Sequence, residues 1–244
     1  MLIVNADDYG RTRIETDVTL KCYGENRITS ATAMVYMADS VRAAELAQSS
    51  SIDLGLHLNL SQPFTGQVSG APLLKDYHNR VIRFIASNKY SRCIYHPALR
   101  REFQYVYQSQ LDEFTKLYGR HPSHIDGHHH AHLCSNMLLD KIIPAQERVR
   151  RSFSFLPGEK SEINRVYRRL VDLSLARRYR LTDFFFSLQH CLHHNAVMRV
   201  YDLSRVAIVE LMTHPADHVE YSYLMSRGYA SALHDLNKGT YASL

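Results

Sequence analysis

The chain has 244 residues, of which 45% are hydrophobic, and this suffices for one sizeable globular core. No apolar run approaches the roughly 20 residues that a membrane-spanning helix needs. The N-terminal segment 1–7 has no basic region and enters a strand pattern at once. It therefore does not resemble a signal peptide, and a cytoplasmic location is expected.

The formal net charge is +5 at pH 7, and much of the excess comes from one arginine-rich stretch. Six arginines lie within sixteen residues: Arg165, Arg168, Arg169, Arg177, Arg178 and Arg180. They predict either an ordinary solvated helix face or a surface for an anionic substrate or lipid headgroup, so a transient contact with a membrane surface stays open. Aromatic residues do not alternate with these arginines, and no nucleic-acid-binding motif is present, so no nucleic acid partner is expected.

The four cysteines are widely spaced and form no Cys-x-x-Cys pair; they are Cys22, Cys93, Cys134 and Cys191. This spacing argues against a structural zinc site built on thiolates. In a cytoplasmic chain the four thiols are expected to be reduced and buried.

Strand-like and helix-like segments alternate along the chain. Strands are predicted, in order, at 2–7, 28–36, 53–60, 123–128, 149–155, 182–188 and 206–213. Helices are predicted at 12–26, 39–48, 97–118 and 161–178, with a looser segment at 61–95 and a helix stop at Gly119. This alternation predicts one α/β domain over 1–244, a closed or nearly closed TIM-like (β/α) barrel of about seven parallel strands.

Polar residues share one face of the third and fourth predicted strands, because side chains two apart on a strand point the same way. In the fourth strand this rule groups His124, Asp126 and His128. In the third strand it groups His57 with Asn59, opposite a face of four leucines that would pack on helices. The polar faces are therefore expected to point into the mouth of the barrel.

The first and last predicted strands carry further polar residues near their carboxyl ends. Glu210 and His214 share a face of the last strand. Asp7 and Asp8 are adjacent and would diverge on a regular strand, so the first strand is expected to end there, with Gly10 helping the chain turn. Barrel enzymes place their active sites at the carboxyl ends of the strands, so one shared site is expected.

Six of the fifteen histidines lie between residues 121 and 132. Neutral histidine is the commonest metal ligand in proteins, and a carboxylate is its usual companion. The pattern predicts a hydrolase that uses a metal-bound water. Which histidine of the run binds metal is open, because His128, His130 and His132 share one strand parity.

Four motifs carry a family resemblance. They are Asn5-Ala-Asp7-Asp8-Tyr-Gly10, Gly55-Leu-His57-Leu-Asn59-Leu, His124-Ile-Asp126-Gly-His128-His129-His130-Ala-His132 and Glu210-Leu-Met-Thr-His214-Pro-Ala. In order and spacing, the chain resembles the YdjC-like carbohydrate deacetylases from about residue 2 to residue 216. This family includes chitooligosaccharide deacetylases and the hopanoid-biosynthesis-associated deacetylase. The resemblance implies a barrel related to NodB-type polysaccharide deacetylases. It also implies hydrolysis of the acetamide of an N-acetylated sugar with one divalent metal ion, magnesium or zinc.

The resemblance also implies a role for each residue that matches a motif. Asp7 would be the general base, and Asp8, His57 and His128 would be the metal ligands. Such a donor set suits a borderline or hard cation, and three protein ligands leave positions open for water and substrate. His214 is the natural acid for the leaving amine, since its ordinary pKa near 6.5 suits proton donation close to neutrality.

Five more residues receive supporting roles. Arg150 is expected to hold the general base or the substrate, as an arginine does in the related NodB-type enzymes. Asn59 and His130 are expected to contact substrate. His124 and Asp126 are expected to orient the metal ligands.

Two other functions are open. His-x-His pairs within the histidine run also fit a dinuclear amidohydrolase or phosphoesterase. A protein that stores or senses metal, or a basic binding module, would need no catalytic acid or base. For the preferred deacetylase the partner is an N-acetylated sugar or glycolipid, and a homodimer is open.

Overall fold

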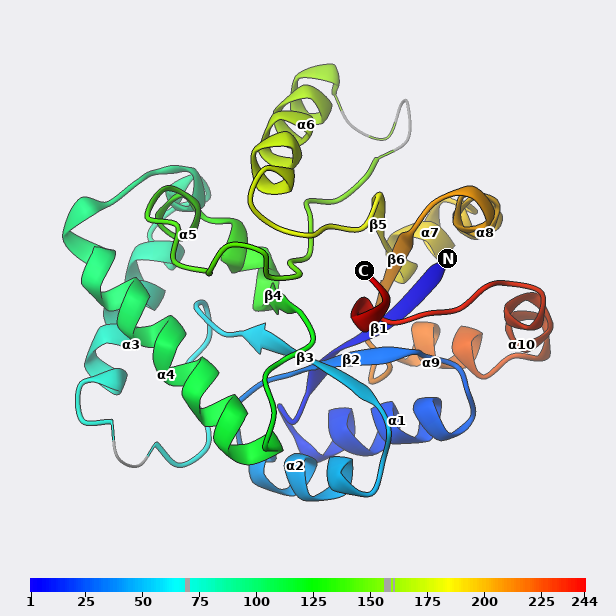
Figure 1. Ribbon diagram of the computed structural model, residues 1–244, viewed down its shortest axis with the longest axis horizontal. Helices are drawn as coiled ribbons and strands as arrows, with labels where there is room; N and C mark the ends of the chain where they lie inside the picture. The colour runs from blue at the N-terminus through cyan, green and yellow to red at the C-terminus, as the bar shows by residue number, and fades with distance from the viewer. Residues whose placement is uncertain (69–70, 156–158, 160) are drawn as a thin grey trace.

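The computed structural model describes residues 1–68, 71–155, 159 and 161–244. Six parallel strands form one curled sheet in the order β4-β3-β2-β1-β6-β5 (Figure 1). The strands are β1 (Leu2–Tyr9), β2 (Ser30–Ala33), β3 (Asp53–Leu58), β4 (Ile125–Gly127), β5 (Phe184–Ser187) and β6 (Val209–Thr213). All the carboxyl ends therefore lie along one edge of the sheet.

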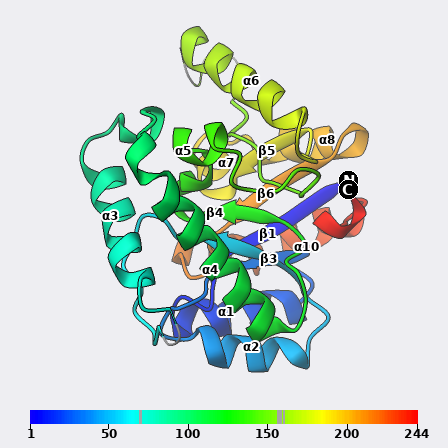
Figure 2. The same ribbon diagram turned by 60° about the vertical axis from the view of Figure 1, so that its left-hand side comes forward.

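Helices surround the curled sheet, and α6 projects from the rest of the molecule (Figures 1 and 2). They are α1 (Arg13–Gly24), α2 (Ser40–Gln48), α3 (Leu74–Ala86), α4 (Arg100–Tyr118), α5 (Ser135–Leu139), α6 (Glu162–Ala176), α7 (Leu188–His193), α8 (Val197–Val206), α9 (His218–Leu224) and α10 (Arg227–His234). Short 3₁₀ turns lie at Ser91–Cys93, Pro97–Leu99, His128–Leu133 and Tyr241–Ser243.

The central strand β1 pairs with β2 on one side and β6 on the other, and all eight of its residues are buried. A parallel strand covered by helices reads as a continuous apolar run, which explains why its first residues are Leu-Ile-Val. The predicted leucine face of β3 is confirmed, since Leu54, Leu56, Leu58 and Leu60 are each at most 1% exposed.

The predicted parallel α/β architecture is confirmed, but the described sheet is a curled half-barrel of six strands and not a closed or nearly closed barrel of about seven. Segment 149–155 forms no named strand; Val149 makes one isolated bridge to Ile125, and the Ser154 amide donates to the Phe185 carbonyl. The segment therefore lies between β4 and β5 without a continuous ladder to either. Its bonds to β4 are confined to Ile125, whose amide donates to the Arg148 carbonyl and whose carbonyl accepts from the Arg150 amide, so the pairing stops after one residue of β4.

The segment predicted to be loose, 61–95, contains helix α3. The inward positions of α3 keep helical spacing, at Leu74, His78, Val81 and Ile85. The spacing is hard to recognise in the sequence because one of the core positions is a histidine. His78 is nevertheless buried, and its Nε2 bonds the Asn59 carbonyl at 2.9 Å. Gly119 ends α4 with a φ of 65°, as predicted.

All four cysteines are free thiols. Three are buried as expected, but Cys93 is exposed because it lies in a surface 3₁₀ turn. Among the described residues, none of the helices is both long enough and apolar enough to cross a bilayer.

Candidate active site

Asp7 and Asp8 reach the same side of the sheet through a break in the strand geometry. Strand β1 continues to Tyr9, but its pairing with β2 shifts between Ala6 and Tyr9. Asp8 has a φ of 67°, in the left-handed region, as does Gly10 at 81°. A residue in this conformation at a bulge redirects its side chain, so both carboxylates can serve one site. The strand was expected to end at these aspartates, but it continues through a bulge to Tyr9.

Asp8, His57 and His128 bring three metal-ligating atoms together at the carboxyl edge. Asp8 Oδ1 lies 2.9 Å from His128 Nδ1 and 3.3 Å from His57 Nε2. The two imidazole nitrogens are 3.4 Å apart. Each side chain is at most 7% exposed, and all three atoms lie within 4.8 Å of one another. This spacing could be spanned by one cation.

Asp126 lies behind His57. Its Oδ1 is 2.7 Å from His57 Nδ1, and its Oδ2 accepts a hydrogen bond from Thr32 Oγ1 at 3.0 Å. Burial by itself lowers the pKa of His57, but the charges of Asp126 and Asp7 raise it to about 10. The site therefore favours positive charge at His57, and the contact leaves Nε2 facing Asp8.

A buried arginine joins three carboxylates beneath this cluster. Arg150 donates two hydrogen bonds of 2.7 Å to Asp7 and lies 2.6 Å from Asp126 Oδ2. Its Nε also donates to Glu210 Oε1 at 2.8 Å. Burial alone would lower the pKa of Arg150, but these carboxylates raise it well above its ordinary value. The arginine therefore stays charged in a fully buried position.

Glu210 completes the network from β6. Burial raises the pKa of Glu210 to about 7, although Arg150 opposes this shift. Tyr241 donates its hydroxyl hydrogen to Glu210 Oε2 from the C-terminal 3₁₀ turn. On its other side the Tyr241 ring stacks on His124, with centroids 3.7 Å apart and planes 7° from parallel.

A pocket of about 690 Å³ opens above the cluster. It is lined by Asp7, Asp8, Arg11, His57, Arg92, Gly127, His128, His129, His130, Met212 and His214. At its rim His214 Nδ1 lies 3.7 Å from Glu220 Oε1, and the His214 side chain is 40% exposed. Burial opposes a charge on His214, but the neighbouring Glu220 carboxylate and the charge of Asp7 raise its pKa above the ordinary value.

Of the residues given supporting roles, Asp126 and Arg150 lie against the cluster and His130 lines the pocket. Asn59 is not among the described residues of the pocket lining; its Nδ2 donates to the Gln62 carbonyl at 2.8 Å. His124 lies away from the pocket, because it stacks on Tyr241.

The histidine run does not keep strand parity. After β4 the chain enters a 3₁₀ turn in which His129 and His130 have φ values of 53° and 56°. His132 consequently bonds the Arg150 carbonyl at 3.0 Å, below the pocket. Of the run, His128 alone belongs to a described group that could hold a metal.

Sequence reasoning gave no role to Thr32, Glu220 or Tyr241. Thr32 sits on β2 between Asn5, Asp7, His57 and Asp126, and bonds several of them. The sequence does contain an indication of Thr32, because Ser30 and Thr32 are polar residues at alternate positions of a short buried strand and so share one face. Glu220 and Tyr241 carry no motif that would have shown them.

The fold and the site define an α/β protein whose curled parallel sheet gathers an Asp-His-His cluster and a buried arginine–carboxylate network at its carboxyl edge. The profile of the family described as YdjC-like protein matches residues 1–235, and the chain belongs to this family.

Its relatives support this assignment. The chain is 31% identical to a carbohydrate deacetylase of Vibrio campbellii over 94% of this chain and 83% of the relative. It is 26% identical to a carbohydrate deacetylase of Mus musculus, over 94% of this chain and 78% of the relative. A chitooligosaccharide deacetylase of Yersinia pestis is 29% identical, but the match covers only 54% of this chain and 51% of that protein.

One solved structure also shows the fold. A protein of Enterococcus faecalis named for cellobiose-phosphate cleavage superposes with a TM-score of 0.69 over 99% of this chain and 97% of that chain. The two sequences are 20% identical, so this likeness concerns the fold alone.

Proposed function

We propose that this protein is a metal-dependent hydrolase that removes the acetyl group from an N-acetylated amino sugar. The sugar belongs to an oligosaccharide or to a glycolipid. The observation that carries the proposal is the meeting of Asp8 Oδ1, His57 Nε2 and His128 Nδ1 within 4.8 Å, in a pocket that Asp7 and His214 also line. The names of the Vibrio and mouse relatives, both carbohydrate deacetylases, support the reaction type.

The residues present fit one divalent cation. Asp8 Oδ1, His57 Nε2 and His128 Nδ1 are buried and lie 2.9 to 3.4 Å from one another, so the three donor atoms already converge on one point that a cation could occupy. One carboxylate and two imidazoles suit zinc or another transition metal better than magnesium, which prefers oxygen ligands. Asp126 would fix the orientation of His57 by accepting from Nδ1.

When bound, the cation lowers the pKa of a water molecule and polarises the acetamide carbonyl. Asp7 lines the same pocket and takes the proton from the attacking water. Arg150 holds the Asp7 carboxylate in one orientation through its two hydrogen bonds, so the base needs no reorganisation at the moment of reaction.

The leaving amine needs a proton, and His214, which lines the same pocket, supplies it. Glu220 is 1% exposed and lies beside the His214 ring, while its Oε2 accepts from the His214 amide at 2.8 Å. This contact raises the pKa of His214 and so favours the protonated imidazole, which is the form a general acid needs.

A dinuclear site is less consistent with the geometry. The second described group that could hold a metal consists of Asp7, His57 and Asp126. Arg150 already lies within 2.7 Å of both of these carboxylates. A second cation would face this buried positive charge, so one ion is proposed.

The test is acetate release by the metal-reconstituted protein, measured with N-acetylglucosamine oligomers and N-acetylated glycolipids. Turnover of one of these classes is expected, and His128→Ala should abolish it. Full activity of this variant would refute the ligand set, and phosphoester turnover with two metal ions per chain would favour the dinuclear alternative.

A further inference from the structure

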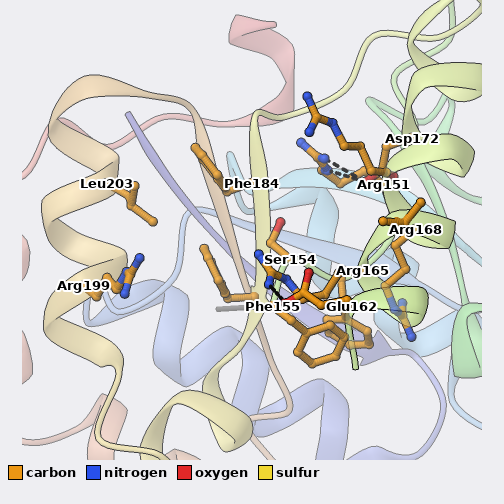
Figure 3. A pocket seen from close by; sticks show the side chains of 14 residues that line it. Arg151, Ser154, Phe155, Glu162, Arg165, Arg168, Asp172, Phe184, Arg199 and Leu203 are labelled. Atoms are coloured by element: carbon orange, nitrogen blue, oxygen red, sulfur yellow. Dashed lines mark hydrogen bonds and ion pairs between the residues drawn. The ribbon is translucent and has the colours of Figure 1, made fainter. Parts of the chain in front are cut away.

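Helix α6 covers the outer face of strand β5 only in part. It turns arginines toward the strand, whereas Leu170 and Leu173 of the same helix are 61% and 54% exposed. A cavity of about 450 Å³ is left between side chains of α6, β5 and α8 (Figure 3). Small organic molecules bind in cavities of this size. We call this space the α6 cavity.

The floor of the α6 cavity is apolar and comes from β5. Phe184 and Phe186 line it, and they occupy alternate positions of the strand, so their side chains share one face. Phe185 points the other way, and its ring centroid lies 4.8 Å from the Arg150 guanidinium. The described lining of the α6 cavity has no residue in common with the pocket of the proposed active site. The two spaces are therefore separate.

The walls of the α6 cavity carry more positive than negative charge. Five arginines but only two acids are among the described lining residues. Both acids are already paired, Glu162 with Arg165 at 2.6 Å and Asp172 with Arg151 at 2.7 Å. The other three arginines have no carboxylate partner among the described residues; they are Arg168, Arg169 and Arg199. The protein itself thus leaves three cations without a counter-ion at one cavity.

Arg168 is held in place inside this cavity. Its Nε donates to Asn164 Oδ1 at 2.8 Å, and its guanidinium lies 5.0 Å from the centroid of the Phe155 ring. Burial lowers the pKa of Arg168, although the charge of Asp172 opposes this shift. An arginine nevertheless stays protonated in a protein, so a partly desolvated charge is fixed here. A fixed guanidinium of this kind is suited to bind an anionic oxygen.

The third of these arginines lies across the cavity. Figure 3 shows Arg199 on α8 at one side and Arg168 on α6 at the other, with Phe155 and Phe184 between them in this view. Cations from two helices therefore face one space above an apolar floor. A ligand that combines a negative group with an apolar part would satisfy both features.

We propose that the α6 cavity binds a small organic phosphate. Its phosphate group contacts Arg168, Arg169 and Arg199, and its apolar part lies on Phe184 and Phe186. Three guanidinium groups without a carboxylate suit a phosphate ester with two negative charges better than a single carboxylate. The apolar floor favours an ester with an aromatic or other apolar group over inorganic phosphate. The proposal does not depend on the reaction proposed above.

The position of the cations favours a soluble ester over a membrane surface. A helix that lies on an anionic membrane carries its cations beside its exposed apolar face. Here Arg165, Arg168 and Arg169 line the cavity instead, and Arg178 of the same arginine-rich stretch donates to backbone carbonyls beyond the helix.

The first test is isothermal titration calorimetry of the metal-reconstituted protein with 1-naphthyl phosphate. Binding is expected, and inorganic phosphate should bind about 10-fold more weakly or worse, because it cannot use the apolar floor. Arg199→Met and Arg169→Met should each raise the Kd for 1-naphthyl phosphate by about 10-fold or more. The matched controls are Arg205→Met and Arg177→Met, since both arginines are exposed outside the cavity lining. They should bind like the wild type.

A further variant shows which pocket is occupied. Arg92 lines the pocket of the proposed active site, so Arg92→Met should leave the affinity for 1-naphthyl phosphate unchanged. Loss of binding in Arg92→Met together with full binding in Arg199→Met would place the ligand in that pocket and overturn the proposal.

Vesicles of phosphatidylcholine with phosphatidic acid distinguish the source of the phosphate. The protein is expected to stay in the supernatant when they are sedimented, which identifies a soluble ester. Cosedimentation that Arg199→Met abolishes would identify a lipid phosphate as the ligand of the same cavity. Failure of both 1-naphthyl phosphate and the vesicles to bind, or binding that neither Arg199→Met nor Arg169→Met weakens, would refute a phosphate site here.

Discussion

Arg150 and Asp7 are 143 residues apart in the sequence and are joined by two hydrogen bonds, each 2.7 Å long, below the pocket that holds the Asp8, His57 and His128 cluster. Both side chains are at most 3% exposed. These hydrogen bonds link β1 to segment 149–155, which was predicted as the fifth strand and lies between β4 and β5 without forming one. The buried guanidinium of Arg150 thus holds Asp7, the proposed base, and ties segment 149–155 to the sheet.

Replacing the Arg150 side chain should destabilise the protein strongly. Arg150→Met leaves Asp7, Asp126 and Glu210 without their shared partner, so the free energy of unfolding should fall by about 3–5 kcal/mol. Chemical denaturation of the metal-free protein measures this. Arg42→Met is the control, because Arg42 is 27% exposed in its ion pairs and should cost at most about 1 kcal/mol. Equal losses in the two variants would contradict the role of Arg150.

Substitutions at a proposed metal ligand and at the proposed base should have different effects on metal content and on turnover. His57→Ala should lose the bound metal, because one of three donor atoms is removed. Asp7→Asn should retain the metal but lose about 10²–10⁴-fold in turnover, because the proposed base is removed. Elemental analysis and acetate release measure the two effects. The exposed His193→Ala serves as a control and should match the wild type in both.

The pH dependence of turnover should report His214. If His214 is the acid, kcat/KM should fall as pH rises through its pKa. Glu220 raises that pKa, so Glu220→Gln should lower it and move the alkaline limb to lower pH. A pH–rate profile in which the limb stays in place would exclude His214 as the acid whose pKa Glu220 sets.

Stability should also depend on pH through Glu210. Burial raises the pKa of Glu210 to about 7 from an ordinary 4.5, so the folded protein holds a proton that the unfolded chain loses in this interval. The contribution of the protonated Glu210 carboxyl to the free energy of unfolding is fully present below pH 4.5. It is lost as pH rises through 7, a change of about 3 kcal/mol. Glu210→Gln cannot titrate, so the difference in unfolding free energy between wild type and variant should follow this course. A constant difference from pH 4.5 to 7 would contradict the raised pKa.

The packing of His124 predicts a steric effect at Gly55. A Cβ at Gly55 would lie 2.5 Å from the His124 ring, which Tyr241 holds from its other face. Gly55→Ala should therefore lower the melting temperature and cost about 1–3 kcal/mol. Gly24→Ala is the matched control, because nothing lies within 4 Å of its added Cβ. A Gly55→Ala protein as stable as this control would show that the ring can move aside.

The sequence by itself determined the parallel α/β architecture and the edge at which the site residues meet. Alternation of strands and helices leaves few other topologies, and parallel strands bring their carboxyl ends together. The buried leucine face of β3 followed from a period of two, which holds wherever backbone angles are regular.

Only the tertiary structure decided what happens where those angles change. Asp8, His129 and His130 adopt positive φ values, so strand parity failed at the paired aspartates and along the histidine run. Positive φ in residues other than glycine is costly and persists only where surrounding contacts enforce it, and a local pattern does not contain those contacts.

The same reason accounts for the remaining differences. Asn59 binds the backbone of its own loop, and Arg150 becomes the centre of three carboxylates from different strands. Helix α6 was predicted from its periodicity, but the side it turns outward was not. Periodicity fixes which residues share a face, whereas long-range packing fixes where that face points.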